Sequence, residues 1–469
     1  MKRSAKAIRD VGEVGGGATD VVDAVILGGG VAGLQAAGKL QAAGLSVILL
    51  EARGRLGGRI ESRRLPGWPG VVETGAEFVH GRPPLLIAAL ARARGRLVPV
   101  PQQHHIAQRG VVAAANRSWK KIQATLEQLP ATDTAFSAAA RLAPAVRALP
   151  GAERRLLENF VEGFNAADAA RVSMRGLARQ ADAEESEGGD RLYRLRDGYH
   201  ALIEHLAAPL QRRTGVVRLG TVVRQVHWKE GGVRVRARAA WGGPLPDVRA
   251  RVALVTLPLG VLQAPARSVG GVRFVPALPA EKRAAIAGLA MGSVVKLVVR
   301  FRASLASSLA PSLPADACFI HAPRAPVPTW WRPLPLPPTV MVGWVGGPAA
   351  ARFATGDSGQ PEVRRQMVER AVRGLGRELG ISSSALCNSV EDAQVFDWAA
   401  DPFARGAYSW VPVGAVNAGA ALAAAVDDCL YFAGEACDSD GDPGTVHGAL
   451  ASGARAAMEI IRRTRQSHR

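Results

Sequence analysis

The chain has 469 residues, more than one compact core normally sustains, so we expect two domains. Hydrophobic residues make up 48% of it, and no apolar run reaches the roughly 18 residues of a membrane-spanning helix, so we expect a soluble protein without a membrane partner. The formal charge is +19, but the arginines are spread along the chain without a helix-turn-helix pattern or an aromatic stacking platform, so no specific nucleic-acid partner is expected.

Residues 1–20 are basic and then glycine-rich, with no apolar segment of the kind found in a signal peptide, and we expect a disordered leader there. The four cysteines have neither the spacing of a zinc site nor the density of a disulfide framework. The sequence therefore predicts a cytoplasmic protein, monomeric or homodimeric, and no metal site.

The first elements in chain order are an apolar strand at 21–27, a small-residue helix at 31–43 and a second strand at 46–50. This succession is typical of the βαβ unit that opens a Rossmann-type α/β domain.

The turn between the first strand and the helix has the pattern GxGxxG. Gly28 permits the tight turn, Gly30 allows the backbone to approach a pyrophosphate, and Gly33 allows close packing of the helix on the strand. Glu51, at the end of the second strand, can accept hydrogen bonds from ribose hydroxyls. The unit therefore predicts a bound dinucleotide.

Two segments that follow, EARGRLGGR at 51–59 and ETGAEFVHG at 73–81, together resemble the flavin-containing amine oxidase superfamily, which implies FAD. The resemblance places the arginines after Glu51 at the phosphates, with Arg59 the best candidate, whereas for Arg53 and Arg55 a solvated surface position is an equally good interpretation. The residues that we expect to contact the cofactor are Gly28, Gly30, Val31, Ala32, Gly33, Glu51, Ala52, Arg53, Gly57, Gly58, Arg59, Gly75, Ala76, Glu77, Phe78, Val223, Trp398, Gly434, Glu435, Thr445 and Val446.

The C-terminal part of the chain supplies an independent match. YFAGE at 431–435 and PGTVHGALASG at 443–453 resemble the last sheet strand and the flavin-facing helix start of polyamine oxidases and lysine-specific histone demethylases. The resemblance implies a helix that begins near Gly444 and directs its positive end at the flavin. It also implies that Glu435 holds a cofactor hydroxyl or a water near the phosphates.

Three further matches lie between these ends, at 193–199 with a helix to Leu210, at 255–262 and at 292–301. In the third, Lys296 interrupts an apolar, β-branched strand, where a lysine is costly without partners or a task. Its spacing alone favours a solvent-facing side chain, whereas the resemblance implies that Lys296 holds a water opposite N5 of the flavin.

The substrate pocket is predicted from the segment 398–409, in which the resemblance places the ring of Tyr408 beside the amine. Thr445 stands where monoamine oxidases have a second tyrosine, and His80 matches a histidine at the pocket rim of animal polyamine oxidases. The acidic segment 182–190 is an ordinary solvated loop by its composition, whereas in related enzymes acids lie near the substrate entrance. The predicted catalytic residues are thus Lys296, Tyr408, His80 and Thr445.

The order of the matches predicts a Rossmann-type FAD-binding domain, assembled from 21–82, 200–290 and 390–469, with an inserted α+β substrate-binding domain at 83–199 and 291–389. We expect the first insert to be mostly helical. The second should open with the strand that carries Lys296, pass through a proline-rich stretch at about 326–338, in which 332–338 is a connecting loop, and continue into a helix at about 362–379.

The expected activity is that of an FAD-dependent amine oxidase that acts on a polyamine or another primary or secondary amine, with oxygen reduced to hydrogen peroxide. Ala407 stands where monoamine oxidases carry the cysteine that links to the flavin, so the FAD should be non-covalent. The alternatives are an L-amino-acid oxidase of the same fold, which needs an arginine to clamp a carboxylate, an FAD-dependent desaturase, and a non-enzymatic nucleic-acid-binding flavoprotein.

Overall fold

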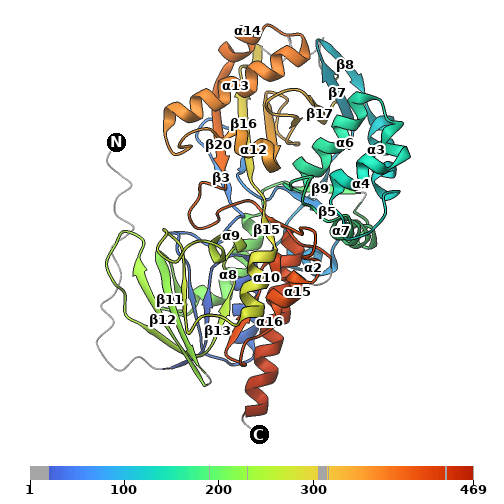
Figure 1. Cartoon of the computed structure of the whole chain (residues 1–469). Helices are drawn as coiled ribbons and strands as arrows, with labels where there is room; N and C mark the ends of the chain where they lie inside the picture. Colours follow the sequence, from blue (N-terminus) through green and yellow to red (C-terminus); the bar gives the residue numbers. More distant parts are fainter. Residues whose placement is uncertain are drawn as a thin grey trace.

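The computed structural model describes residues 21–189, 191–229, 231–304, 314, 316–438 and 441–467. The expected leader at 1–20 lies outside the described residues. Two large sheets organise the chain, and they occupy the lower and upper parts of Figure 1.

The lower sheet has eight strands in the order β10-β2-β1-β13-β12-β11-β14, with β22 paired to β13. Strands β1, β2, β13 and β22 are parallel to one another, as the predicted βαβ unit requires. The bounds are β1 Val22–Leu27, β2 Val47–Leu50, β10 Val217–Arg218, β11 Thr221–Lys229, β12 Gly232–Ala239, β13 Val248–Val255, β14 Arg273–Val275 and β22 Leu430–Phe432.

Helices cover both faces of the parallel part of this sheet. In β1, Ala24 and Ile26 belong to one hydrophobic core, whereas Val25 and Leu27 belong to a second core on the opposite face. Both faces are buried, which explains why β1 is a continuous apolar run and does not alternate with polar residues. The helices are α1 Val31–Ala42, α2 Pro84–Arg92, α8 His200–Gln211, α9 Leu259–Leu262, α10 Ala280–Gly288, α15 Ala418–Ala423, the 3-10 helix η1 Glu435–Cys437 and α16 Val446–Ser467.

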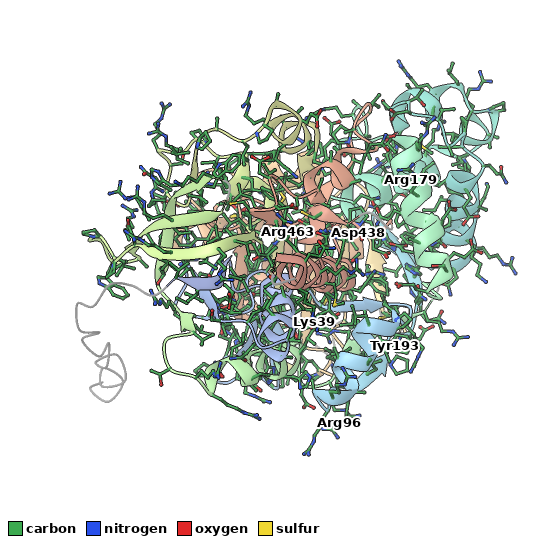
Figure 2. All side chains as sticks on the ribbon, turned by 90° about the horizontal axis from the view of Figure 1, so that it is seen from below. Lys39, Arg96, Arg179, Tyr193, Asp438 and Arg463 are labelled. Carbon is green, nitrogen blue, oxygen red and sulfur yellow. The ribbon has the colours of Figure 1, made fainter. Side chains whose placement is uncertain are left out.

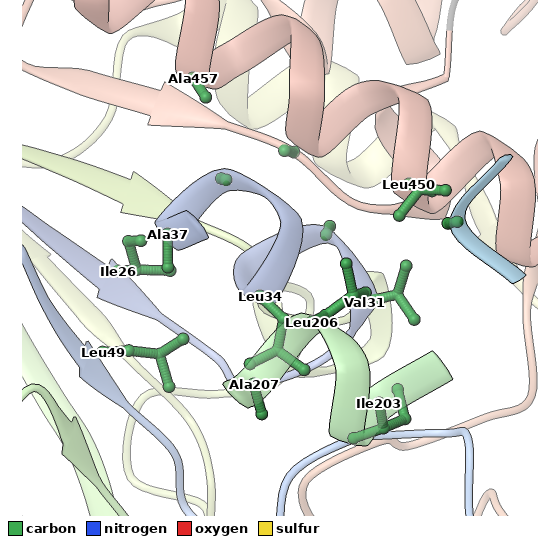
Figure 3. Close-up of a cluster of buried hydrophobic side chains, with 14 of the residues drawn as sticks. Ile26, Val31, Leu34, Ala37, Leu49, Ile203, Leu206, Ala207, Leu450 and Ala457 are labelled. Carbon is green, nitrogen blue, oxygen red and sulfur yellow. The ribbon is translucent and has the colours of Figure 1, made fainter. Parts of the chain in front are cut away.

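The first of these cores joins segments that are far apart in the sequence. Figure 3 shows Val31 and Leu34 of α1 packed between α8, which carries Leu206, and α16, which carries Leu450. The N-terminal βαβ unit is therefore held in place by the C-terminal helix.

The upper sheet has seven strands in the order β20-β16-β19-β18-β17-β7-β8. Helix α13 covers one face, so the odd-numbered residues Val295, Leu297 and Val299 of β16 pack in its core. The even-numbered positions 296 and 298 face the other side. The elements are β7 His104–Gln108, β8 Val111–Ala114, β16 Val294–Phe301, β17 Phe319–His321, β18 Thr329–Trp331, β19 Val340–Gly346, β20 Val390–Asp397, α12 Gly347–Phe353, α13 Pro361–Leu379 and α14 Ser383–Asn388.

Strand β20 bears on the expected domain division. The sequence assigned 390–469 to the cofactor domain, but β20 pairs along its whole length with β16 in the upper sheet. We propose to place that boundary after Asp397 and to keep the rest of the division as proposed. In the proline-rich stretch, 332–338 is a loop as expected, and the structure adds the short strand β18 just before it.

The first insert is mostly helical, as predicted, with short strands at its edges. Its sheet β5-β9-β6 is antiparallel, and β5 directly precedes the insert. The remaining elements are β3 Ser62–Arg64, β4 Val71–Glu73, β5 Phe78–His80, β6 Leu97–Pro99, α3 Asn116–Glu127, α4 Phe136–Leu142, α5 Pro144–Arg147, α6 Gly151–Phe164, α7 Met174–Ser186, β9 Leu192–Leu195, β15 Ala290–Met291 and β21 Ser409–Trp410. Among the described residues, no helix is both long and apolar enough to cross a membrane.

Candidate active site

A single cavity of about 470 Å³ runs from the glycine turn after β1 to an aromatic region between the two sheets. Every predicted site residue except Gly33 lines it, including all four predicted catalytic residues. The tertiary structure thus brings together residues from both ends and from the middle of the chain.

The glycine turn has the geometry that its motif predicts. Gly28 has a φ of +115°, a conformation that favours glycine, and the Thr256 hydroxyl donates hydrogen bonds to the carbonyls of Leu27 and Gly28. A Cβ on Gly33 would lie 2.1 Å from the Gly28 carbonyl oxygen. Gly33 therefore acts in helix packing, as its place in the motif predicts, and its contact with the cofactor stays a prediction.

The N-terminus of α1 fits a pyrophosphate group. Gly30 is its N-cap, no side chain caps the helix, and no acidic residue lies in the first turn. A Cβ on Gly30 would meet no atom within 4 Å, so the space before the helix is open. Uncapped N–H groups and the helix dipole together favour an anion at this position.

Glu51 is buried at the end of β2 and lines the same part of the cavity. Its Oε2 accepts a hydrogen bond from the Gly29 N–H at 2.7 Å, and its Oε1 accepts one from the Arg53 N–H at 2.8 Å. The carboxylate thus also fixes the glycine turn, a role that the motif alone did not reveal.

The arginines after Glu51 differ in their positions. Arg53 lines the cavity and pairs with Asp401 at 2.7 Å, and Arg59 lines it and pairs with Glu435 at 2.8 Å. Arg55 does not line the cavity and pairs with Glu61 at 3.1 Å. The solvated interpretation is therefore wrong for Arg53, whose side chain is only 15% exposed.

Lys296 faces the interior, so the solvent-facing interpretation of this residue is wrong. Its side chain is 1% exposed, and Nζ lies 2.5 Å from Oε2 of Glu77 and 3.3 Å from the Gly75 carbonyl oxygen. Glu77 also contacts Arg194 at 2.8 Å and accepts a hydrogen bond from the indole N–H of Trp331 at 3.0 Å. Burial alone would raise the pKa of Glu77, but Arg194 and Lys296 hold it below its ordinary value, so the group is a carboxylate.

The far end of the cavity is aromatic. Tyr408 lines it, and its hydroxyl donates a hydrogen bond to the Phe164 carbonyl at 2.5 Å. His80 packs edge-on against the ring of Phe164, and burial lowers the pKa of His80 to about 4, with a further contribution from His447. The imidazole of His80 is therefore neutral near pH 7.

The start of α16 is tied to the cavity wall. Thr445 caps the helix, because its hydroxyl accepts a hydrogen bond from the Gly448 N–H at 2.9 Å. Glu435 is fully engaged by protein groups: it accepts hydrogen bonds from the Ser409 hydroxyl at 2.6 Å and the Gly444 N–H at 3.1 Å, besides its pair with Arg59. The structure thus gives Glu435 a role in holding this loop, and its expected contact with a cofactor hydroxyl or a water near the phosphates stays a prediction.

The acidic segment is mostly helical and not a loop, because 182–186 forms the last part of α7. Glu184 of this segment lines the cavity, and burial raises its pKa. The interpretation as acids near the substrate entrance therefore fits Glu184. The interpretation as a solvated segment fits Asp182, Glu185 and Ser186, which are exposed.

Sequence reasoning missed several aromatic residues of the cavity. Trp331 lies in the proline-rich stretch, directly before the predicted connecting loop at 332–338, and its contact with Glu77 depends on the pairing of β18 with β19. The tryptophan pair at 330–331, flanked by prolines, was the available signal for a buried strand. The other cavity aromatics that were missed are Trp119, Phe160, Phe164, Tyr199, Phe319, Trp344 and Phe403, with His104 and His321 stacked beside Trp119.

Solved structures share this fold. Cyclohexylamine oxidase from Brevibacterium oxydans superimposes with a TM-score of 0.74 at 20% identity, over 95% of this chain and all of that one. A putrescine oxidase bound to putrescine also gives a TM-score of 0.74 at 20% identity, with the same coverage.

Curated relatives cover nearly the whole chain. Polyamine oxidase 1 of Oryza sativa subsp. japonica is 28% identical over 94% of this chain and 97% of its own length. Lysine-specific histone demethylase 1 homolog 1 of Arabidopsis thaliana is 28% identical over 94% of this chain but only 52% of its own length. The chain therefore spans about half the length of such demethylase homologues. Residues 31–461 match the family model described as flavin containing amine oxidoreductase, so the chain belongs to the flavin-containing amine oxidoreductases.

Proposed function

We propose that this protein is an FAD-dependent oxidase of a polyamine or another primary or secondary amine. The substrate C–N bond would be oxidised to an imine with reduction of oxygen to hydrogen peroxide, and water would then hydrolyse the imine to an aldehyde and an amine. The observation that carries the proposal is the buried Lys296–Glu77 pair, in a cavity that is continuous with the glycine turn and α1.

The residues around the glycine turn fit non-covalent FAD. The uncapped start of α1 would hold the pyrophosphate, Glu51 the ribose, and Arg59 the phosphate side of the site. When bound, the cofactor supplies the hydride acceptor and passes the electrons to oxygen. None of the cysteines lines the cavity, and Ala407 does, which supports a non-covalent cofactor.

The chain's own residues would bind and orient the amine. The ring of Tyr408 and the indoles of Trp331 and Trp344 offer aromatic surfaces that favour a cation in transit and exclude water. Neutral His80 can accept a hydrogen bond from a distal amine, and Lys296 would hold a water at the reacting face of the flavin.

The alternatives have less support. An L-amino-acid oxidase needs an arginine to clamp the substrate carboxylate. The arginines among the described lining residues are Arg53 and Arg59, and each is already paired with a carboxylate. A desaturase is disfavoured because Lys296 and Tyr408 both lie in the cavity.

A nucleic-acid-binding role without turnover is disfavoured by the distribution of charge. In Figure 2, nitrogen-tipped side chains project around the whole outline of the molecule, with Lys39, Arg96, Arg179 and Arg463 on separate segments.

Cysteine usage, with four free thiols, supports a cytoplasmic enzyme.

The test is peroxide release from a panel of polyamines, aryl-alkylamines, N-methylated lysine peptides and L-amino acids, together with anaerobic bleaching of the flavin absorbance. We expect turnover with at least one amine and none with L-amino acids. Turnover of L-amino acids alone would replace the proposal with the amino-acid oxidase. Absence of bleaching by every amine, combined with salt-sensitive retention on DNA, would favour the non-enzymatic alternative.

A further inference from the structure

Three potential metal ligands meet where α7 ends and α16 begins. Glu187 follows α7, Asp442 lies in the loop before α16, and His447 lies in the first turn of α16. One nitrogen or oxygen atom from each side chain lies within 4.8 Å of the other two. Nε2 of His447 is 3.2 Å from Oδ1 of Asp442 and 3.5 Å from Oε2 of Glu187.

The polar atoms at the centre of this cluster lack hydrogen-bond partners. His447 is 7% exposed, and its Nε2 makes no hydrogen bond in the described part of the chain. Oδ1 of Asp442 is likewise buried without a hydrogen bond, although it lies so close to Nε2. Leaving two such buried atoms unsatisfied carries a free-energy cost, because each has lost its hydrogen bonds to water without replacing them. A shared partner that accepts a lone pair from each atom removes this cost.

The two distances from Nε2 of His447 match those between ligands of a tetrahedral zinc site. Bonds of about 2.0–2.1 Å at the tetrahedral angle place two ligand atoms about 3.3 Å apart, close to both distances from Nε2 of His447. One imidazole nitrogen and two carboxylate oxygens are also a donor set that suits this borderline cation. We propose that Glu187, Asp442 and His447 bind Zn²⁺, with water as the remaining ligand.

The backbone around Asp442 is held firmly enough to present such a ligand. The N–H groups of Gly441 and Asp442 donate to one carboxylate oxygen of Asp438, at 3.1 and 2.6 Å. The Asp442 carbonyl accepts a hydrogen bond from Thr445, the cap of α16.

The loop also packs directly on α7. A Cβ on Gly441 would lie 2.9 Å from the carbonyl oxygen of Arg179, and Figure 2 shows Arg179 and Asp438 on these neighbouring segments. Glu187 is fixed from its other side, because its carbonyl accepts the Arg82 N–H at 2.8 Å. A metal here joins the end of α7 to the start of α16, in the wall of the cavity that His447 lines.

The site follows no linear metal motif, since 254 residues lie between Glu187 and Asp442. The expectation of no metal site rested on cysteine spacing, which does not bear on a carboxylate–imidazole site. The proposal is independent of the amine oxidase function, because its readouts are metal content and affinity and not turnover.

The experiment measures zinc binding to the flavin-loaded protein after dialysis against a chelator. Titration with zinc sulfate in a calorimeter should give one site per chain, and the melting temperature should rise with zinc. Glu187→Gln and Asp442→Asn should each weaken binding at least about tenfold, since even the loss of groups that only orient a ligand costs 10- to 100-fold. The matched control is Glu185→Gln, an exposed acid two positions from Glu187, which should bind zinc like the wild type.

Flavin content and circular dichroism establish that each variant is folded. Zinc-edge anomalous scattering from crystals of the wild type provides a second measurement, which needs no variant. A peak between the three side chains supports the proposal. Absence of stoichiometric binding, a peak elsewhere, or wild-type affinity in folded Glu187→Gln protein overturns it.

Discussion

Nζ of Lys296 lies 2.5 Å from Oε2 of Glu77, and both side chains are almost completely buried beside the cavity. Breaking a buried ion pair from one side usually leaves an uncompensated charge. Here Arg194 contacts the same carboxylate at 2.8 Å, so Glu77 keeps a cationic partner if Lys296 is replaced. This arrangement makes the function of Lys296 separable from folding.

Lys296→Met retains the apolar length of the side chain and removes the ammonium group. We expect the variant to fold and bind flavin, with turnover reduced about 10- to 1,000-fold, or roughly 1.4 to 4 kcal/mol of barrier. Rapid mixing would assign the loss to the reductive or the oxidative half-reaction.

The matched control is Lys282→Met, because Lys282 is also buried but lies away from the cavity and donates to carbonyls at the end of α15. It should lower the melting temperature and leave the rate per flavin unchanged. If fully flavinated Lys296→Met reacted at the wild-type rate in both half-reactions, Lys296 would have no part in the mechanism and the desaturase alternative would reopen.

Glu51→Ala should weaken FAD binding by about 1.5 to 3 kcal/mol, or roughly 10- to 150-fold, because it removes the acceptor for ribose and releases the N–H of Gly29. Fluorescence titration of the apoprotein with FAD measures the effect. Glu51→Gln retains one acceptor oxygen and should lose less. Glu61→Gln, a nearby acid that does not line the cavity, should retain wild-type affinity. Full flavin occupancy of Glu51→Ala at low FAD concentration would contradict the assigned role.

The flavin should leave the protein on denaturation. Ala407 stands at the cavity where a linking cysteine would be needed, and Cys318, Cys387, Cys429 and Cys437 lie outside the lining. Acid or heat precipitation should release yellow flavin into the supernatant. A pellet that retains the colour after washing would show a covalent bond.

Two replacements separate the ring of Tyr408 from its hydroxyl. Tyr408→Phe loses only the hydrogen bond to the Phe164 carbonyl and should lower kcat/KM a few-fold, about 1 kcal/mol. Tyr408→Leu also loses the aromatic face and should cost a further 2- to 30-fold, the range of a cation–π contact. Steady-state kinetics on the best amine would measure both. Equal losses in the two variants would assign the role to the hydroxyl alone.

Glu73 should make stability depend on pH near neutrality. Its carboxylate accepts hydrogen bonds from the Tyr199 N–H and the Ser62 hydroxyl, yet burial raises its pKa to about 7 from the ordinary 4.5. At pH values between these two pKa values, Glu73 holds a proton in the folded protein but has lost it in the unfolded chain. The contribution of Glu73 to the free energy of unfolding is therefore complete below pH 4.5 and is lost as the pH rises through 7.

Glu73→Gln mimics the protonated group: its amide oxygen can accept the Tyr199 N–H, and its NH2 can donate to the Ser62 hydroxyl oxygen. The two pKa values differ by an amount that corresponds to about 3 kcal/mol, so the variant should melt a few degrees above the wild type at pH 8 and close to it at pH 5. Glu281→Gln, on the exposed side of α10, gives the background. A difference in melting temperature that is the same at both pH values would contradict the assignment.

The sequence by itself determined the features that are local in the chain. The βαβ unit, with Gly28 at positive φ and Glu51 at the end of β2, depends on short-range sterics and apolar periodicity, which a linear pattern records directly. The same holds for the start of α16 close to the predicted Gly444 and for the identity of the family, whose motifs are contiguous.

The tertiary structure decided the direction and the partners of side chains. Lys296 has the spacing of a surface lysine, and only the position of α13 on the opposite face of β16 turns it towards Glu77. The assignment of β20 to the upper sheet likewise depends on strand pairing between segments about 95 residues apart, which short-range periodicity does not encode. Sequence spacing carries no information on how distant segments meet, and for this reason the contacts of Trp331, Glu435 and His447 became visible only in the fold.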